Sequence, residues 1–264
     1  MKAAVLALFL VGLIVASGAD ARTWRVNTAG TGDAPNLYAA MDSAQALDVV
    51  LVEAGEYHLS SQLRVPGSVR LVGESGPGHT LLYRDEYLDG GTISLLAGAT
   101  ISGIYVRGNT QVVLFIHLNG FADHCILEST VDVDVVQNEG GKPTFQNCLF
   151  VGGEIGCSAD LVRCIIFSDL GNRAVGSWVV ECDVLGSVDP RIDVSSYDAN
   201  FSLDPQFCGI PGSGNYFLKS TSPCLPGSNP YGSPHLTGPL GAGCGAVSVQ
   251  SSTWGAIKAL YRSP

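Results

Sequence analysis

Two aspartates alternate with valines in the stretch Val131-Asp132-Val133-Asp134-Val135-Val136. This alternation predicts a strand that buries its valines and turns Asp132 and Asp134 outward, roughly 7 Å apart at about 3.3 Å per residue. Such a separation suits two carboxylates flanking a water in an inverting glycosidase, or two ligands of a calcium ion. A solvated strand with no ligand shows the same pattern, and this is the simpler interpretation.

An aromatic ring and an imidazole precede the aspartates by about one repeat. The stretch 112–118 also alternates, and it presents Phe115 and His117 outward. If this stretch stacks about 4.8 Å from the aspartate strand, all four side chains share one face. The ligand-binding candidates are therefore Phe115, His117, Asp132 and Asp134, and the two aspartates are also the candidates for catalysis and for calcium.

These side chains lie within a repeat. Short apolar segments separated by Gly and Pro continue to about residue 187, and five of them share the form apolar-x-turn-apolar-x-apolar. A second set interleaves with them, at 92–96, 112–118, 131–136, 153–157 and 174–178. Two strands in every coil of roughly 20 residues predict a β-solenoid. The fourth positions of the first set should form an internal ladder, and they are Ile104, Cys125, Cys148, Cys164 and Cys182, at intervals of 21, 23, 16 and 18 residues.

Two other architectures fit the pattern less well. A leucine-rich horseshoe has a similar period, but its Leu-x-x-Leu-x-Leu frame is missing. An immunoglobulin-like sandwich has no columns at coil spacing. The solenoid remains the best interpretation.

One segment before the repeat has helical periodicity. Asp33 can cap a helix over residues 33–47, with Pro35 in its first turn. Such a helix would cover the open end of the solenoid. Its apolar face would consist of Leu37, Ala40, Met41, Ala44 and Leu47.

The first coils resemble a known family. Residues 48–57, 69–76 and 80–83 read DVVLVEAGEY, VRLVGESG and TLLY, and they are similar to the first coils of secreted bacterial pectin-lyase-like proteins. The resemblance spans about residues 22–190. It implies an all-β fold, in which a single chain forms a right-handed parallel β-helix of six or seven coils with an N-terminal cap helix and a loop-rich C-terminal extension. This architecture hosts lyases, hydrolases, epimerases and non-catalytic proteins, so it implies no particular activity.

The chain divides into four parts by composition. Residues 1–21 read as a secretory signal peptide, which predicts a mature chain that is secreted or held at the cell surface. The β-helix then spans residues 22–197. A Cys-, Pro- and Gly-rich extension at 198–250 is expected to pack on the solenoid. It would cover an apolar stripe of outward solenoid side chains, Ile126, Leu149 and Ile165; the alternative is that another molecule covers this stripe. The tail at 251–264 is either a sorting or docking tag or a loosely packed end.

The cysteines fall into two groups. Those in the ladder should be buried thiols, since stacked parallel side chains rarely reach disulfide geometry. Cys208, Cys224 and Cys244 lie in the extension, where one pair should form a disulfide that the sequence does not specify. Cys157 receives no role, and zinc is disfavoured because no Cys-x-x-Cys occurs.

The net charge of the chain limits the classes of partner that it can bind. The chain has 14 basic and 24 acidic residues, a net charge of −10, which disfavours nucleic acid and anionic membranes. No later stretch is long and apolar enough to cross a membrane. We expect a monomer whose partner is an extracellular polysaccharide or a cell-surface component. No cofactor is expected, with calcium as the alternative.

The sequence favours a secreted or cell-surface protein that is non-catalytic or binds carbohydrate. The alternative is a polysaccharide lyase or glycoside hydrolase acting on an extracellular polysaccharide. The motifs Asn-Thr-Asp, Asp-Asp, Gly-His-Gly and Arg-Ile-Lys of polygalacturonase-like enzymes are absent in that form. An enzyme would need a groove with an acid and a base within reach of a bound sugar.

Overall fold

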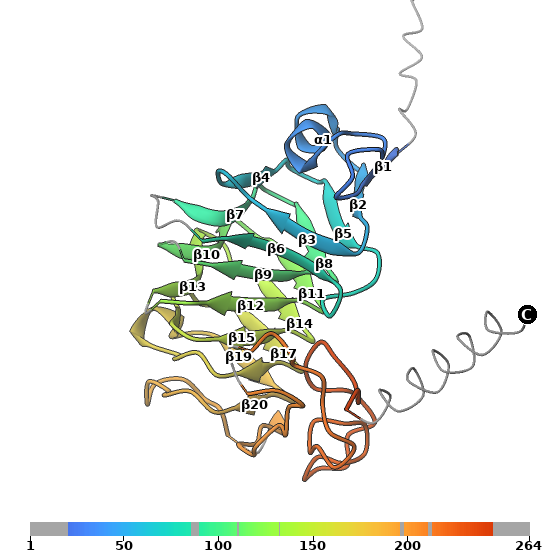
Figure 1. Cartoon of the computed structure of the whole chain (residues 1–264). Helices are drawn as coiled ribbons and strands as arrows, with labels where there is room; N and C mark the ends of the chain where they lie inside the picture. The colour runs from blue at the N-terminus through green and yellow to red at the C-terminus, as the bar shows by residue number, and fades with distance from the viewer. Residues whose placement is uncertain are drawn as a thin grey trace, which may run out of the picture.

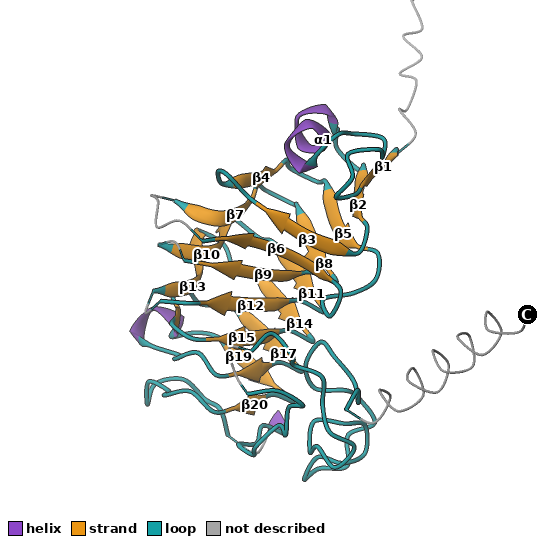
Figure 2. Cartoon of the chain, in the orientation of Figure 1, coloured by secondary structure: helices purple, strands orange, loops and turns teal. Residues whose placement is uncertain are grey.

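The structure is a computed structural model that describes residues 21–85, 90–109, 111–131, 133–195, 198–210 and 213–244. The proposed signal peptide, apart from Ala21, and the tail at 251–264 lie outside these residues. Within them the chain winds into stacked parallel strands, with one α-helix at the N-terminal end and a loop-rich segment at the other (Figures 1 and 2). No described helix is long and apolar enough to span a membrane.

The described strands form three parallel sheets, here called A, B and C. Each coil contributes a strand to A, then to B, and in the middle of the solenoid to C, which gives about seven turns. Sheet A contains β1 (Thr23–Val26), β2 (Val49–Val52), β5 (Arg70–Gly73), β8 (Thr100–Ser102), β11 (Phe121–Asp123), β14 (Thr144–Gln146), β17 (Asp160–Val162) and β19 (Trp178–Val180). Sheet B contains β3 (Gly55–His58), β6 (Thr80–Arg84), β9 (Tyr105–Gly108), β12 (Ile126–Ser129), β15 (Leu149–Val151), β18 (Ile165–Ile166) and β20 (Asp183–Val184). Sheet C contains β4 (Leu63–Val65), β7 (Gly91–Leu95), β10 (Val112–His117), β13 (Asp134–Glu139) and β16 (Glu154–Ile155). The predicted parallel β-solenoid is confirmed.

A repeated turn joins sheet A to sheet B. Its turning residue has a positive φ in four successive coils, at His124 (50°), Asn147 (51°), Arg163 (54°) and Glu181 (53°). This left-handed conformation is unfavourable for side chains other than Gly and Asn, so neighbouring coils must support it. Support comes from side chains of adjacent coils, because Arg163 Nε donates to Asn147 Oδ1 at 3.1 Å and Asn147 Nδ2 donates to Asp123 Oδ1, at the end of β11, at 3.1 Å.

The predicted internal ladder follows directly after these turns. All five of its members have no solvent exposure, and its cysteines are free thiols. Cys182 Sγ accepts a hydrogen bond from Cys164 N–H at 3.2 Å, so the stack is closely packed. Burial raises the pKa of the Cys148 thiol well above its usual value. The ladder consists of Ile104, Cys125, Cys148, Cys164 and Cys182.

The cap helix is shorter than predicted. Helix α1 spans Leu37–Ser43, and Asn36 rather than Asp33 caps it by accepting from Ala39 N at 2.9 Å. Asp33 instead accepts from the backbone N–H of Arg25 at 2.8 Å. Leu47 is 67% exposed because the helix ends before it and the chain turns there with a positive φ of 76°.

Three predicted strands of the second set differ in the structure. The strand placed at 131–136 begins three residues later, as β13, and the one at 153–157 shrinks to the two residues of β16. Residues 174–178 form no strand of sheet C. A 3₁₀ turn, η1 (Asn172–Ala174), stands there instead, and Trp178 opens β19 of sheet A. The Gly-Asn sequence directly before Arg173 favours a turn over a strand.

The segment from 198 to 244 packs against the outer face of sheet B. Outward side chains of that sheet, such as Ile126 and Leu149, form a second hydrophobic cluster with Phe207, Tyr216 and Leu218 of the extension. This cluster lies apart from the solenoid core. The apolar stripe is therefore covered by the chain itself. One disulfide, Cys208–Cys244, closes the extension, while Cys224 is a buried free thiol.

Candidate functional site

Phe115 and His117 point outward from β10, as the sequence predicts. Both are partly exposed, and their rings meet edge to face with centroids 4.9 Å apart. Nδ1 of His117 lies 3.0 Å from Oε2 of Glu139 on the next strand. By register Phe115 stands beside Gln137 and His117 beside Glu139. The carboxylate nearest to the imidazole is thus Glu139, which the sequence analysis did not select.

Asp134 lies on the outer face of sheet C, but it is not exposed to solvent as the sequence predicts, because another side chain covers it. Its register partner on β10 is Val112, three positions before Phe115, and the residue is only 7% exposed. The predicted alternation of buried and exposed side chains breaks down here, because the neighbouring residues Val135 and Val136 are both fully buried. Asp132 lies outside the described residues, so the predicted pairing of the two aspartates stays a prediction.

An arginine from a later coil covers Asp134. Arg173 of η1 donates from Nη1 to Asp134 Oδ2 at 2.7 Å and from Nη2 to Oδ1, a two-point contact that is stronger than a single ion pair. Gln137 donates from its side-chain amide to the same carboxylate. Nη2 of Arg173 also lies 3.5 Å from Oε2 of Glu154. The guanidinium therefore bridges two acids from successive coils.

Glu154 is the register neighbour of Asp134 on β16. Adjacent strands lie about 4.8 Å apart, so the two acids stack on one edge of sheet C. Two glycines leave the room that this arrangement needs. A Cβ at Gly156 would lie 2.9 Å from the Asp134 carboxyl carbon, and one at Gly171 would lie 2.2 Å from Oε1 of Glu154.

Cys157 lies beside this cluster as a nearly buried thiol. Burial is the main cause that raises its pKa to about 12; the charge of Asp134 raises the pKa further, while Arg173 opposes this. A thiol of this kind is protonated at neutral pH and is a poor nucleophile. The chemistry of the cluster therefore belongs to its carboxylates and its guanidinium.

The outer face of sheet C thus carries one continuous polar strip. It runs from the cluster of Asp134, Glu154 and Arg173, past Gln137 and Phe115, to His117 and Glu139. Five strand positions separate the two ends, roughly 17 Å at about 3.3 Å per residue. We call these seven residues the sheet C strip.

The proposed calcium site does not fit the described part of the strip. Both carboxylate oxygens of Asp134 accept hydrogen bonds from Arg173, which leaves a positive charge where a cation would bind. Among the described residues no group of three His, Cys, Asp or Glu side chains could hold a metal ion.

Sequence reasoning missed Glu154, Arg173 and Gln137. The coil spacing contains a usable signal, because Glu154 follows Asp134 by 20 residues and Arg173 follows Glu154 by 19. The arrangement of acid, acid and arginine in successive coils could have been noticed.

Comparison with known proteins gives only distant likenesses. No protein-family model matches the chain, and the curated proteins contain no significant match. Among solved structures, the pectin methylesterase PemA from Erwinia chrysanthemi matches 68% of this chain at 12% identity, with a TM-score of 0.43. The pectin methylesterase from carrot matches 82% of this chain and 94% of its own, at 14% identity, with a TM-score of 0.39. The chain spans 58% of the PemA chain.

These likenesses are too low to transfer an activity or the role of any residue. The three parallel sheets are the evidence for the fold. The chain is a parallel β-helix.

Proposed function

We propose that this chain is an exported protein that binds an extracellular polysaccharide along the sheet C strip. The observation that carries the proposal is the outward aromatic and imidazole pair of Phe115 and His117, placed between hydrogen-bonding side chains on one flat sheet face. Aromatic rings offer apolar faces to sugar rings, while amides and carboxylates bind hydroxyl groups. The length of the strip suits several consecutive sugar units.

Export is part of the same proposal. It rests on the leader-like residues 1–21 and on a disulfide between Cys208 and Cys244, which requires an oxidising compartment. Edman sequencing or mass spectrometry of the secreted chain tests it, with Arg22 as the expected first residue. A retained leader would contradict export through this route.

A second candidate function is hydrolysis of the bound polysaccharide. It is favoured by the stacking of Asp134 on Glu154, because about 4.8 Å between strands is close to the roughly 5–5.5 Å between the carboxyl groups of retaining glycosidases. Arg173 would hold the pair in place. In this role Asp134 and Glu154 would be the reacting carboxylates.

The test is a glycan-array screen of residues 22–264, with and without calcium. Hits are then measured by titration for the native chain and for Phe115→Ala, whose affinity should fall about tenfold, the equivalent of about 1.4 kcal/mol of lost stacking. Phe121→Ala is the matched control, because Phe121 is a partly exposed phenylalanine on sheet A. Binding that is absent, or equally strong in Phe115→Ala, would overturn the proposal.

Every hit is also incubated with the protein and analysed for cleaved product. Product that is lost in both Asp134→Asn and Glu154→Gln, with binding retained, would establish the hydrolase. Binding without product from any hit would leave the non-catalytic function.

A further inference from the structure

The outer face of sheet B is exposed in the first coils of the solenoid and covered by the extension in the later ones. The extension covers it from Tyr105 of β9 onward, while the first strands β3 and β6 keep exposed or partly exposed outward side chains. By register these side chains form two rows. One row contains Glu56, Leu81 and Tyr105, and the other contains His58, Tyr83 and Arg107.

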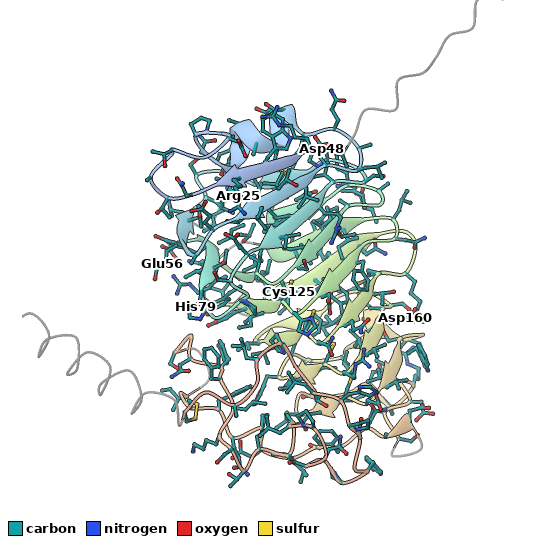
Figure 3. The ribbon with its side chains drawn as sticks, turned by 90° about the vertical axis from the view of Figure 1, so that its right-hand side faces the viewer. Arg25, Asp48, Glu56, His79, Cys125 and Asp160 are labelled. Carbon is teal, nitrogen blue, oxygen red and sulfur yellow. A yellow bond between two sulfur atoms is a disulfide. The ribbon has the colours of Figure 1, made fainter. Side chains whose placement is uncertain are left out.

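A pocket of about 320 Å³ lies where the edge of the extension meets the outer face of sheet B. Glu56, Leu81, Tyr105 and Arg107 line it from the sheet, His79 from the turn before β6, and Ser213–Asn215 from the extension. This volume is near the lower end of the roughly 300–1,000 Å³ found for small-molecule pockets, so it fits one sugar ring better than a chain. Glu56 and His79 lie at the same edge of the molecule, close to the extension (Figure 3).

The segments that line the pocket are in close contact with one another. His79 and Phe217 of the extension have ring centroids 6.4 Å apart, and a Cβ at Gly78 would lie 2.8 Å from the Phe217 ring. On the opposite side a Cβ at Gly214 would lie 3.7 Å from the Tyr105 ring. The extension therefore contacts both the turn and the sheet, and it defines the pocket as a built feature.

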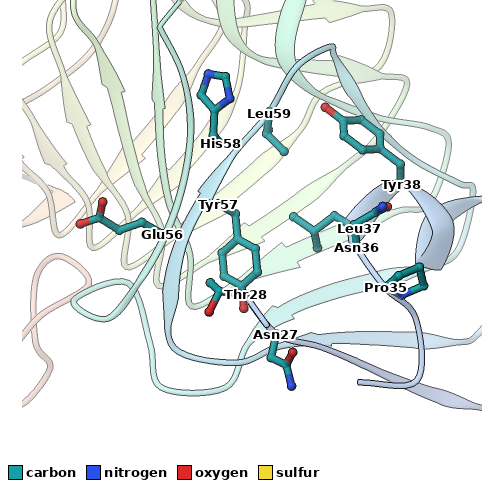
Figure 4. Close-up of a pocket in the computed structure, with 10 residues that line it drawn as sticks. All are labelled: Asn27, Thr28, Pro35, Asn36, Leu37, Tyr38, Glu56, Tyr57, His58 and Leu59. Carbon is teal, nitrogen blue, oxygen red and sulfur yellow. The ribbon is translucent and has the colours of Figure 1, made fainter. Parts of the chain in front are cut away.

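The side chain of Glu56 lies on the outer face of sheet B, where it lines the pocket. In Figure 4, a close-up of a separate pocket beside the cap helix, Glu56 and His58 project from one side of β3, while Tyr57 and Leu59 project from the other, toward the cap residues. Tyr57 is bound in place, because its hydroxyl donates to Glu53 O at 2.9 Å. Glu56 makes no such hydrogen bond with the described residues and is exposed.

The charges around the pocket favour a neutral ligand. Arg107 lies 3.6 Å from Asp85, its guanidinium stacks 5.2 Å from the Tyr83 ring centroid, and its register neighbour on β12 is Glu128. Glu56 lines the same pocket as Arg107. Three acids therefore stand against one arginine on this part of sheet B: Asp85 by ion pair, Glu128 by register and Glu56 across the pocket. A ligand carboxylate would meet this excess of negative charge, whereas hydroxyl groups can accept from Arg107 and donate to Glu56.

We propose that this pocket binds one neutral hexopyranose unit. Arg107 and His79 would donate to its hydroxyls, Glu56 would accept from them, and Leu81 and the edge of Tyr105 would contact its apolar face. The site lies on sheet B, apart from the sheet C strip, so it does not depend on the function proposed above.

The experiment is a titration of the native chain with glucose, mannose and galactose, together with galacturonate as the charged counterpart of galactose. We expect a dissociation constant of about 1 mM for at least one neutral hexose, equal to about 4 kcal/mol, and binding of galacturonate at least about tenfold weaker than that of the neutral hexose. Binding of no neutral hexose, or tighter binding of galacturonate, would overturn the proposal.

Variants locate the bound sugar. Arg107→Gln and Glu56→Ala should each weaken hexose binding about tenfold or more, and Leu81→Trp should abolish it by filling the pocket. Arg70→Gln, at an exposed arginine of sheet A, is the matched control and should bind normally. Thermal melts confirm that each variant folds. Hexose affinity unchanged in all three pocket variants would overturn the site.

Phe115→Ala separates this proposal from the polysaccharide one. It should retain hexose binding whether or not its polysaccharide binding is lost. Loss of hexose binding in folded Phe115→Ala would place the sugar on sheet C and refute the pocket.

Discussion

Tyr216 of the extension donates a hydrogen bond of 2.9 Å to the carboxylate of Glu128, 88 residues earlier in the solenoid. Tyr105 donates to the same oxygen from the neighbouring strand, and Glu128 itself is only 4% exposed. Burial and the contact with Glu128 raise the pKa of Tyr105 strongly, so its hydroxyl stays a donor at any ordinary pH. A buried carboxylate thus joins the extension to sheet B.

Replacing Tyr216 by phenylalanine should destabilise the protein by about 1–3 kcal/mol. The change removes one donor and leaves a buried carboxylate only partly satisfied. Urea unfolding at neutral pH measures it. Tyr231→Phe is the control, because Tyr231 is 46% exposed and its hydroxyl donates to a backbone oxygen, so it should cost much less. Equal losses would show that Glu128 adds nothing to the contact.

Asp183 should make stability depend on pH. It is fully buried under the extension, where desolvation raises its pKa to about 7 although Leu203 N–H and Cys224 Sγ contact the carboxylate. The folded state therefore binds more protons than the unfolded state, whose pKa is about 3.9, and stability falls as pH rises from about 4 to 7. The full effect is on the order of 4 kcal/mol.

Asp183→Asn provides the test of that slope. The variant keeps the size of the side chain and an oxygen for Leu203, but it has no charge to bury. Its stability relative to the native chain should increase between pH 4 and pH 7 and stay level above about pH 8. Urea midpoints measured across this range would contradict the assignment if the two curves run parallel.

The Cys208–Cys244 disulfide should stabilise mainly the extension. It closes a loop of 36 residues, for which chain entropy gives about 4 kcal/mol. The double variant Cys208→Ala, Cys244→Ala should be cut by protease within 198–244 before the solenoid is cut. Thiol counting supplies an independent check, since the denatured chain should show six thiols before reduction and eight after it. Eight before reduction would show that the bond is absent.

Arg173 should be coupled to Asp134. Its removal in Arg173→Met leaves a nearly buried carboxylate without its cation. Because the guanidinium itself is 47% exposed and screened by solvent, the loss should be about 1–3 kcal/mol. In an Asp134→Asn background the same change should cost far less. A double-mutant cycle by urea unfolding measures the difference, and additive losses would mean that the two residues do not interact.

The fold could be predicted from the sequence because its repeat is local. Ile104 and the four ladder cysteines recur at coil spacing, and each carries a small or medium apolar side chain that tolerates stacking on itself. The limits of the cap helix were harder to place, because Asn36 and Asp33 can both serve as caps and tertiary contacts decide between them. The exposed Leu47 has the same explanation, because the sequence did not show that the helix ends before it.

The candidate site could be predicted only in part. Phe115 and His117 stand outward because strand alternation is itself local. The burial of Asp134 depends on Arg173, 39 residues later and directly before the segment 174–178, whose apolar pattern favoured a strand. Glu128 and Asp183 were unpredictable as buried acids for the same reason, since the chain that covers them arrives only after the solenoid is complete.

The turn that joins sheet A to sheet B returns the chain to the same column in every coil, although the coils differ from 16 to 23 residues in length. Length differences are absorbed elsewhere in the coil, so each coil is a separable unit. A whole coil could be removed or duplicated between two ladder positions, and the coils on either side would still meet in register. The length of the solenoid is therefore set by how many coils the gene encodes.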